Sequence, residues 1–232
     1  MKVIFVGGCH LVGKPHGVQY SFVRLLWRRW RKLNRNLHFD MVPYAVNWEA
    51  LLQACKDGLA RSPDVLILNI QAGLVLPTWE RTLKRWQVTT GETAQATLNW
   101  LAPTIWKSQG KGRIYWGIKG ALIVLLGGHR ENWHRIREIW EELTHLFAQS
   151  PSRIIVMTPT PVRKEYFVWG KAHLERVRKM ILVLEGHCYE VCDVYPELLV
   201  IGSEALWVDG QHISIVGHIK VADALGRLLN II

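Results

Sequence analysis

Short apolar runs alternate along this chain with longer segments in which apolar residues return every three or four positions. The short runs predict strands at 3–6, 39–46, 64–70, 154–157 and 189–194. The longer segments predict helices at 18–34, 48–60, 131–149, 171–185 and 215–229. Apolar strands of this kind are buried on both faces, so the alternation predicts a mostly parallel central sheet with helices on both sides, a three-layer α/β sandwich.

The loops that follow the strands are where functional residues are expected, because open parallel sheets bind ligands beyond the carboxyl ends of their strands. Cys9 follows the first predicted strand after two glycines, and the segments 71–73 and 158–161 follow the third and fourth strands. We expect these loops, and the loop before the last helix, to meet at one edge of the sheet.

The size of the chain suits one α/β domain: it has 232 residues, of which 49% are hydrophobic. We therefore expect 1–232 to form a single domain. The stretch at about 74–130 departs from the alternation and contains five tryptophans, Trp79, Trp86, Trp100, Trp106 and Trp116. This Trp-rich insertion has three interpretations: it completes the core, it forms a lid over the site, or it is a partner surface, since long inserts in compact domains are often functional.

Several kinds of segment are not expected. No apolar run approaches the roughly 18 residues of a membrane span, and the N-terminus lacks the features of a signal peptide. The four cysteines, Cys9, Cys55, Cys188 and Cys192, are scattered and do not form a disulfide framework. His187, Cys188 and Cys192 match no common zinc spacing. We expect a cytoplasmic protein without a transmembrane segment, metal or cofactor.

A surplus of positive charge, +10 at pH 7, favours anionic partners. Much of it falls on the basic helix 24–35, which carries Arg24, Arg28, Arg29, Arg31, Lys32 and Arg35. Two interpretations stay open: a solvated helix face, or a surface for an anionic lipid or substrate. No zinc-finger or nucleotide-binding motif accompanies this helix, so nucleic acid is not an expected partner.

Two elements of the sequence carry reactive chemistry. Cys9 ends a glycine turn, and a thiolate beside a histidine is a strong nucleophile, although most free cysteines are small buried hydrophobes. Asp209 stands three residues before His212. A carboxylate so placed can orient an imidazole that acts as a general base, although Asp-Gly is also ordinary turn chemistry.

Four stretches of the chain together resemble the SGNH (GDSL-like) hydrolase family. The segment 209–218, Asp-Gly-Gln-His-Ile-Ser-Ile-Val-Gly-His, is similar to the family's last block, in which Asp-x-x-His precedes Ser-x-x-Gly-His. The segment 3–9 lies where the family has its first strand and Gly-Asp-Ser, 154–161 resembles the fourth strand with its Thr-Pro-Pro-Pro ending, and 192–196 resembles the Asp-x-Tyr step. Their order and spacing agree over nearly the whole chain.

The resemblance implies a flavodoxin-like sandwich and acyl-transfer chemistry, usually ester hydrolysis. Carried over by position, Cys9 is the nucleophile in place of the family's serine, His212 is the base and Asp209 is its orienting partner. The substrate is then a small molecule with an acyl group.

The oxyanion hole implied by the resemblance has no complete counterpart in this sequence. The family uses the nucleophile's backbone N–H, a glycine after the second strand and an asparagine after the third. Here Gly8 replaces the first-block aspartate, the segment 44–47 contains no glycine, and Gly73 falls at the asparagine's position. Candidates for oxyanion or substrate binding are therefore Gly8, Asn47, Asn69, Gln71 and Gly73.

Three functions agree with these residues. The first is an ester or thioester hydrolase or acyltransferase that uses a Cys-His-Asp triad. The second is a catalytically silent binding protein, and the third is a protein recruited to another reaction in the same cleft. We take the first as the working hypothesis, because nucleophile, base and orienting carboxylate are all chemically competent.

Overall fold

Five parallel strands form one sheet in the order β2-β1-β3-β4-β5. A computed structural model of the chain describes residues 1–33, 36, 38–45, 47–76, 133–163, 170–207 and 210–230. The strands are β1 (Lys2–Gly7), β2 (His38–Pro43), β3 (Val65–Asn69), β4 (Arg153–Met157) and β5 (Glu190–Cys192). The chain passes from β1 to β2 in one direction and then back across β1 to β3. The carboxyl ends of β1 and β3 therefore flank the point where such sheets bind ligands.

Six helices cover the sheet in the part of the chain that the structure describes. They are α1 (Phe22–Leu33), α2 (Trp48–Ala60), α6 (Trp133–Ala148), α7 (Gly170–Leu182), α8 (Tyr195–Ile201) and α9 (Ile215–Leu228). Short 3-10 turns lie at η1 (Val18–Tyr20), η2 (Ala72–Leu74) and η3 (Gly202–Ala205).

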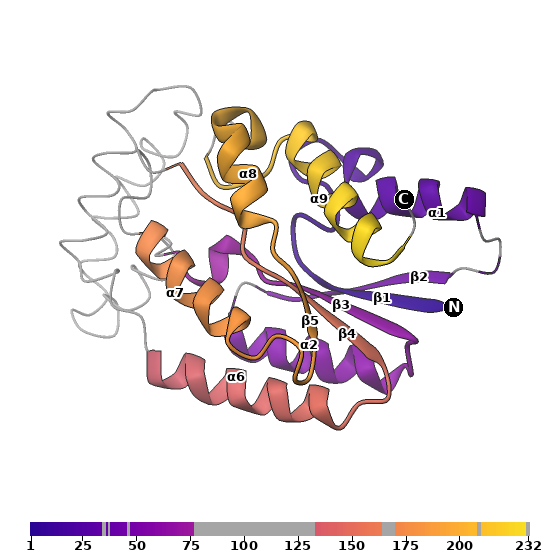
Figure 1. Ribbon diagram of the computed structural model, residues 1–232, viewed down its shortest axis with the longest axis vertical. Helices are drawn as coiled ribbons and strands as arrows, with labels where there is room; N and C mark the ends of the chain where they lie inside the picture. Colours follow the sequence, from indigo (N-terminus) through magenta and orange to yellow (C-terminus); the bar gives the residue numbers. More distant parts are fainter. Residues whose placement is uncertain are drawn as a thin grey trace, which may run out of the picture.

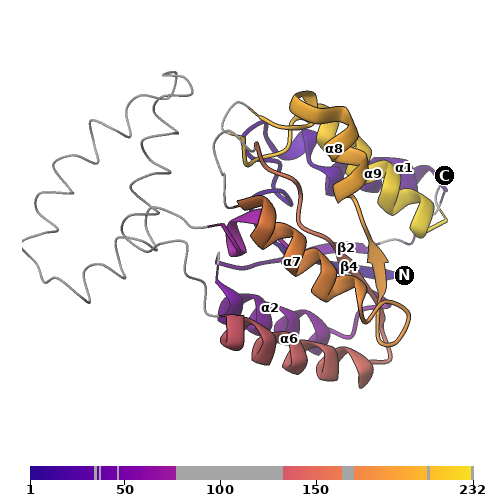
Figure 2. The same cartoon turned by 60° about the vertical axis from the view of Figure 1, so that its left-hand side comes forward.

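The helices divide into two layers, one on each face of the sheet (Figures 1 and 2). Successive strand residues point to opposite faces, so β1 supplies both layers. Its Ile4 and Val6 pack in the core cluster of α2, α6 and α7, whereas Val3 and Phe5 pack in the cluster of α1, α8 and α9. We call these the α2 layer and the α9 layer.

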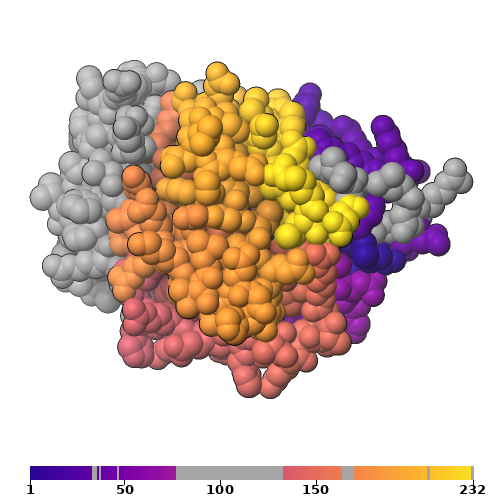
Figure 3. All heavy atoms as spheres, in the orientation of Figure 1, coloured from indigo at the N-terminus to yellow at the C-terminus, as the bar shows by residue number. Residues whose placement is uncertain are grey.

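The α9 layer joins the two ends of the chain. In Figure 3 the yellow atoms of the C-terminal part lie against the indigo atoms of the N-terminal part. The contact between α1 and α9 is held by the Phe22 backbone N–H, which donates to Nδ1 of His218 at 3.2 Å. The N-terminal and C-terminal segments of the sequence are therefore neighbours on the same face of the sheet.

The predicted three-layer α/β fold is confirmed, and all five predicted strands are present with ends that differ by at most three residues. The helix predicted at 48–60 has those bounds, and the other predicted helices differ at their ends. The helix predicted at 18–34 was wrong at its start, because Val18–Tyr20 form a separate 3-10 turn and α1 begins at Phe22. The Ser21 hydroxyl accepts a hydrogen bond from the Arg24 N–H at 3.1 Å, and this cap fixes the start of α1.

The helix α8 was not predicted. It has 7 residues and a proline in its first turn, where proline costs no backbone hydrogen bond. Most of the Trp-rich insertion predicted at about 74–130 lies outside the described residues, which resume at Trp133. The prediction of a single domain stays a prediction.

Among the described helices, none has both the length and the hydropathy that crossing a membrane requires.

Candidate functional site

Cys9 lies in a run of turns at the carboxyl end of β1. The Leu11 N–H donates to the Gly8 carbonyl at 2.9 Å, and the Lys14 N–H donates to the Cys9 carbonyl at 3.1 Å. Gly13 has a φ of 70°, and a Cβ there would lie 2.3 Å from the Gly17 carbonyl oxygen, so the turn requires glycine. This geometry leaves Cys9 partly exposed at the carboxyl ends of the strands.

The Cys9 thiol contacts Gln71, which follows β3. Its Sγ lies 3.3 Å from Oε1 of Gln71, the acceptor of the thiol hydrogen. Gln71 is only 3% exposed, and its Nε2 has no hydrogen-bond partner among the described residues. A buried amide with one end on the candidate nucleophile and an unpaired donor at the other is an unusual arrangement, since buried polar groups are normally paired.

Tyr44 fixes the backbone from which Gln71 projects. Its hydroxyl donates to the Asn69 carbonyl at 2.8 Å and accepts from the Gln71 N–H at 3.3 Å. Tyr44 is buried, and burial raises the pKa of its hydroxyl well above the ordinary value. The hydroxyl therefore stays neutral and holds the loop after β3 in place.

Histidine rings gather beside Cys9. His10 is 2% exposed, and its ring centroid lies 5.8 Å from that of His212 and 6.2 Å from that of His218. The loop that carries His212 folds back on the end of η3 and the residues after it, since the Trp207 N–H donates to the His212 carbonyl at 2.7 Å and the Ser214 N–H donates to the Ala205 carbonyl at 2.9 Å. His212 and Cys9 thus come to the same sheet edge from opposite ends of the chain. No three His, Cys, Asp or Glu side chains among the described residues are grouped so that they could hold a metal ion.

His218 is a buried, neutral member of this group. Burial, with His16 and His212 nearby, lowers the pKa of His218 from its ordinary 6.5 to about 3. Its Nδ1 accepts from Phe22, so in the neutral ring the proton is on Nε2, which has no partner among the described residues. His218 therefore joins α9 to α1 and is not available to take up a proton near neutral pH.

The other predicted site residues lie as follows. Asp209 lies outside the described residues. The Asn47 Oδ1 caps α2 by accepting from the Ala50 N–H at 2.7 Å, and Nδ2 of Asn69 lies 3.9 Å from the Met157 sulfur. Neither is hydrogen-bonded to Cys9 among the described contacts. Gly73 is buried in η2.

Gly8 has a specific spatial role. A Cβ on Gly8 would lie 1.7 Å from Nε2 of Gln71, so any side chain there would displace the amide. The sequence analysis identified both residues as candidates but did not foresee that one makes room for the other. Tyr44 was missed, because nothing in its sequence context distinguishes it from an ordinary core residue, and His10 was weighed as a residue that tunes the thiol or as a solvated loop histidine, whereas the structure buries it.

Several solved structures share this fold across nearly the whole chain. A lipase/acylhydrolase from Enterococcus faecalis is 15% identical, with a TM-score of 0.60 over 98% of this chain and 94% of its own. A member of the lipolytic G-D-S-L family from Veillonella parvula is 11% identical, with a TM-score of 0.55 over 99% and 98%. A catalytic mutant of an acetylxylan esterase from Geobacillus stearothermophilus is 16% identical, with a TM-score of 0.60 over 97% and 92%.

Comparison with family models and with curated proteins finds no match. At the identities of the solved structures, the likeness is one of fold. It confirms the predicted SGNH-hydrolase-like architecture, a parallel sheet with helices on both faces.

Proposed function

We propose that this chain is an acyl-transfer enzyme, an ester or thioester hydrolase or an acyltransferase, with Cys9 as its nucleophile. His212 is the general base and Asp209 orients it. Three proteins named for lipolytic or acetylxylan-esterase activity share the fold, which supports an acyl substrate. The observation that carries the proposal is the 5.8 Å separation of the His212 ring from that of His10, the residue next to Cys9.

The proposed reaction has two halves. His212 takes the proton of the Cys9 thiol, the sulfur bonds to the substrate carbonyl carbon, and the carbonyl electrons move to oxygen. Collapse of this oxyanion breaks the bond to the leaving group, which takes the proton from His212. Water or another acceptor then gives its proton to His212 and attacks the carbonyl carbon of the acylated Cys9. The carbon–sulfur bond breaks, His212 returns the proton to sulfur, and the product leaves.

The test is intact-protein mass spectrometry after brief exposure to a panel of acyl thioesters and activated esters. We expect the wild type to gain one acyl mass or to turn over, whereas Cys9→Ala gains none and His212→Ala gains it far more slowly. Cys188→Ala is the matched control, because Cys188 is also a partly exposed free thiol but lies away from the site. It should behave like the wild type.

Two results would count against the proposal. Acylation of Cys9→Ala at the wild-type rate would move the nucleophile elsewhere. A wild type that reacts with no member of the panel would favour the silent binding protein, or a different reaction in the same cleft.

The basic helix supports a second role, an anionic lipid surface as docking partner. α1 contains five cations and no carboxylate, and among the described residues only Arg29 has an acidic partner, Asp223 at 2.6 Å. The guanidinium groups of Arg24 and Arg31 lie 4.0 and 5.1 Å from the Trp27 ring centroid. Basic residues interleaved with tryptophan are typical of interfacial helices.

Vesicle binding tests this role. We expect binding to phosphatidylcholine vesicles that contain phosphatidylserine, weakening as salt rises, and none to pure phosphatidylcholine. Arg28→Glu with Lys32→Glu should weaken binding by about tenfold or more. Arg137→Glu with Lys179→Glu makes the same charge change on the α2 layer and should have little effect. Equal loss in both pairs, or tighter binding to DNA than to vesicles, would rule the role out.

A further inference from the structure

The loop that carries His212 is tied to the segment that follows β4. The Arg163 N–H donates to the Gly210 carbonyl at 2.9 Å, and the Gly210 N–H donates to the Trp207 carbonyl, also at 2.9 Å. Gly210 is buried, and its φ of 71° is one that other residues rarely adopt. The backbone is therefore held on both sides of Gly210, two residues before the proposed base.

The segment 158–161, which leads from β4 toward Arg163, is stiff. Pro159 and Pro161 have a fixed φ, and each proline restricts the residue before it to extended backbone. These preceding residues are Thr158 and Thr160, which are 0% and 1% exposed. Four successive buried residues thus have little conformational freedom, so a displacement at the start of the segment is passed on to Arg163.

Asp193, which follows β5, anchors the start of this segment. Its Oδ1 accepts from the Thr158 hydroxyl at 2.8 Å, and the Thr158 N–H donates to the Cys192 carbonyl at 3.2 Å. Arg178 of α7 holds the same carboxylate: its Nε lies 3.0 Å from both carboxylate oxygens, and its Nη2 donates to Oδ2. Arginine and carboxylate groups in such a pair have a defined mutual orientation, so Asp193 is itself held in place.

We propose that Asp193 is a positioning residue for His212. Its carboxylate fixes the start of the segment 158–161, and the hydrogen bond beyond the end of that segment fixes Gly210. A shift of about 1 Å in a catalytic group can slow a reaction about a hundredfold, so the placement of this loop bears directly on the rate. The inference rests on the proposed acyl transfer, in which His212 is the base.

A second ion pair joins the same two strands at their other ends and provides a matched control. Arg153, the first residue of β4, donates from Nε and Nη2 to the two carboxylate oxygens of Glu190, the first residue of β5, at 2.6 and 2.7 Å. Because the strands are parallel, this pair lies at their amino ends, away from the loop of His212. Loss of either carboxylate removes an ion pair, but only Asp193 is connected to that loop through the segment 158–161.

Steady-state hydrolysis of p-nitrophenyl acetate tests the proposal. We expect Asp193→Ala and Thr158→Val to lower kcat by about tenfold or more with little change in KM, whereas Glu190→Ala stays near the wild type. Thr158→Ser keeps the hydroxyl and should restore the rate. Thr158→Val leaves the ion pair of Asp193 with Arg178 intact, so it tests the same connection if Asp193→Ala does not fold.

A double-mutant cycle separates positioning of the base from a general structural effect. In His212→Ala the base is already absent, so Thr158→Val should lower kcat little further, whereas an unrelated structural effect would add in full. An unchanged kcat in Thr158→Val, or full additivity with His212→Ala, would overturn the inference while acyl transfer stands.

The imidazole NMR signals of His212, assigned by their loss in His212→Ala, provide a readout that does not depend on activity. They should shift in Thr158→Val and stay as in the wild type in Glu190→Ala. A wild type that never reacts would overturn the acyl transfer, and these signals then decide the positioning: a shift in Thr158→Val alone supports it, and unshifted signals overturn it.

Discussion

Both layers bury apolar side chains, but the α9 layer also buries imidazoles beside the turn that carries Cys9. Fully buried residues of the first include Leu51, Ile139 and Leu143, and no charged or histidine side chain is buried there in the part of the chain that the structure describes. The second places His218 between α9 and the first turn of α1, with His10 nearby. The same strands contribute side chains to both layers, so the difference in buried imidazoles arises from the helices and loops.

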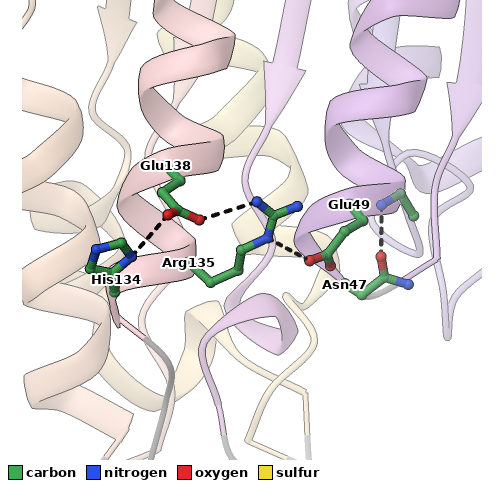
Figure 4. Close-up of polar contacts among 6 residues, drawn as sticks. Asn47, Glu49, His134, Arg135 and Glu138 are labelled. Carbon is green, nitrogen blue, oxygen red and sulfur yellow. Dashed lines mark hydrogen bonds and ion pairs between the residues drawn. The ribbon is translucent and has the colours of Figure 1, made fainter.

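The two layers also differ at their surfaces. In the α2 layer, Arg135 bridges two helices by pairing with Glu49 of α2 and Glu138 of its own helix, both at 3.2 Å (Figure 4). Lys56 pairs with Glu142 at 2.6 Å in the same layer. In α1 of the α9 layer, four of the five cations have no carboxylate partner among the described residues. Ion pairs between helices therefore brace the α2 layer, whereas the proposed chemistry and the proposed lipid contact both fall on the α9 layer.

A cavity in the α2 layer should cost stability without touching the chemistry. Leu51 is fully buried on α2, so Leu51→Ala should lower the free energy of unfolding by about 2–5 kcal/mol. Urea denaturation measures this loss. The rate at which iodoacetamide alkylates Cys9 in the folded protein should not change. A large change in that rate would contradict the expectation that the core of the α2 layer affects stability alone.

Acid should weaken the α9 layer through His218. The unfolded state binds a proton at this ring near pH 6.5, whereas the folded state does not until about pH 3, so the unfolded state binds more protons between these values. The contribution of neutral His218 is complete above pH 6.5 and is lost as pH falls, at up to about 1.4 kcal/mol per pH unit.

Urea denaturation over a pH series measures this slope, and at about pH 5 the loss should reach roughly 2 kcal/mol. His218→Asn should remove the slope. The same change at His134, an exposed ring on α6, should leave the slope as in the wild type. Equal slopes in His218→Asn and the wild type would contradict the expectation.

We expect Asn47 to stabilise α2 and to take no part in the proposed reaction. Asn47→Ala removes the cap on the Ala50 N–H and should cost about 1 kcal/mol of unfolding free energy. Asn47→Ser keeps a capping oxygen but has no amide donor, so its stability and its acylation rate should both stay near those of the wild type. Slow acylation in an Asn47→Ser protein of wild-type stability would make Asn47 a donor at the site.

The smallest effect concerns the surface charges themselves. Lys56→Met breaks an exposed ion pair and should cost at most about 1 kcal/mol. Arg28→Met, in α1, breaks no ion pair among the described residues and should cost less than Lys56→Met in the same thermal or urea measurement. The reverse order would show that the unpaired cations stabilise the fold.

The order of strands and helices was predictable because buried strands and amphipathic helices leave periodic patterns in the sequence. The helix over Trp48–Ala60 was found to the residue, since Asn47 is a good cap and apolar residues recur along one face. The start of α1 was not, because Val18 suits an apolar helical face in sequence but is exposed in the structure. The short helix α8 offers too few turns for a period to be seen.

The site was only partly predictable. The sequence indicated Cys9 and His212 through local motifs, and the structure brings both to the loops at the carboxyl end of the sheet. It could not show that Gln71 fills the space over Gly8, because that fit depends on two loops meeting across β1 and β3. The cytoplasmic location and the role of Asp209 stay predictions.

The hydrogen bond from Phe22 to His218 also bears on the order in which the protein is completed during synthesis. Its partners are 196 positions apart, so a ribosome releases the first helix long before the ring that binds its first turn. Until α9 emerges, Leu26 and Trp30 on α1 lack their full apolar cover. His10, the residue next to Cys9, therefore acquires its neighbours His212 and His218 only after the intervening strands and helices have been made.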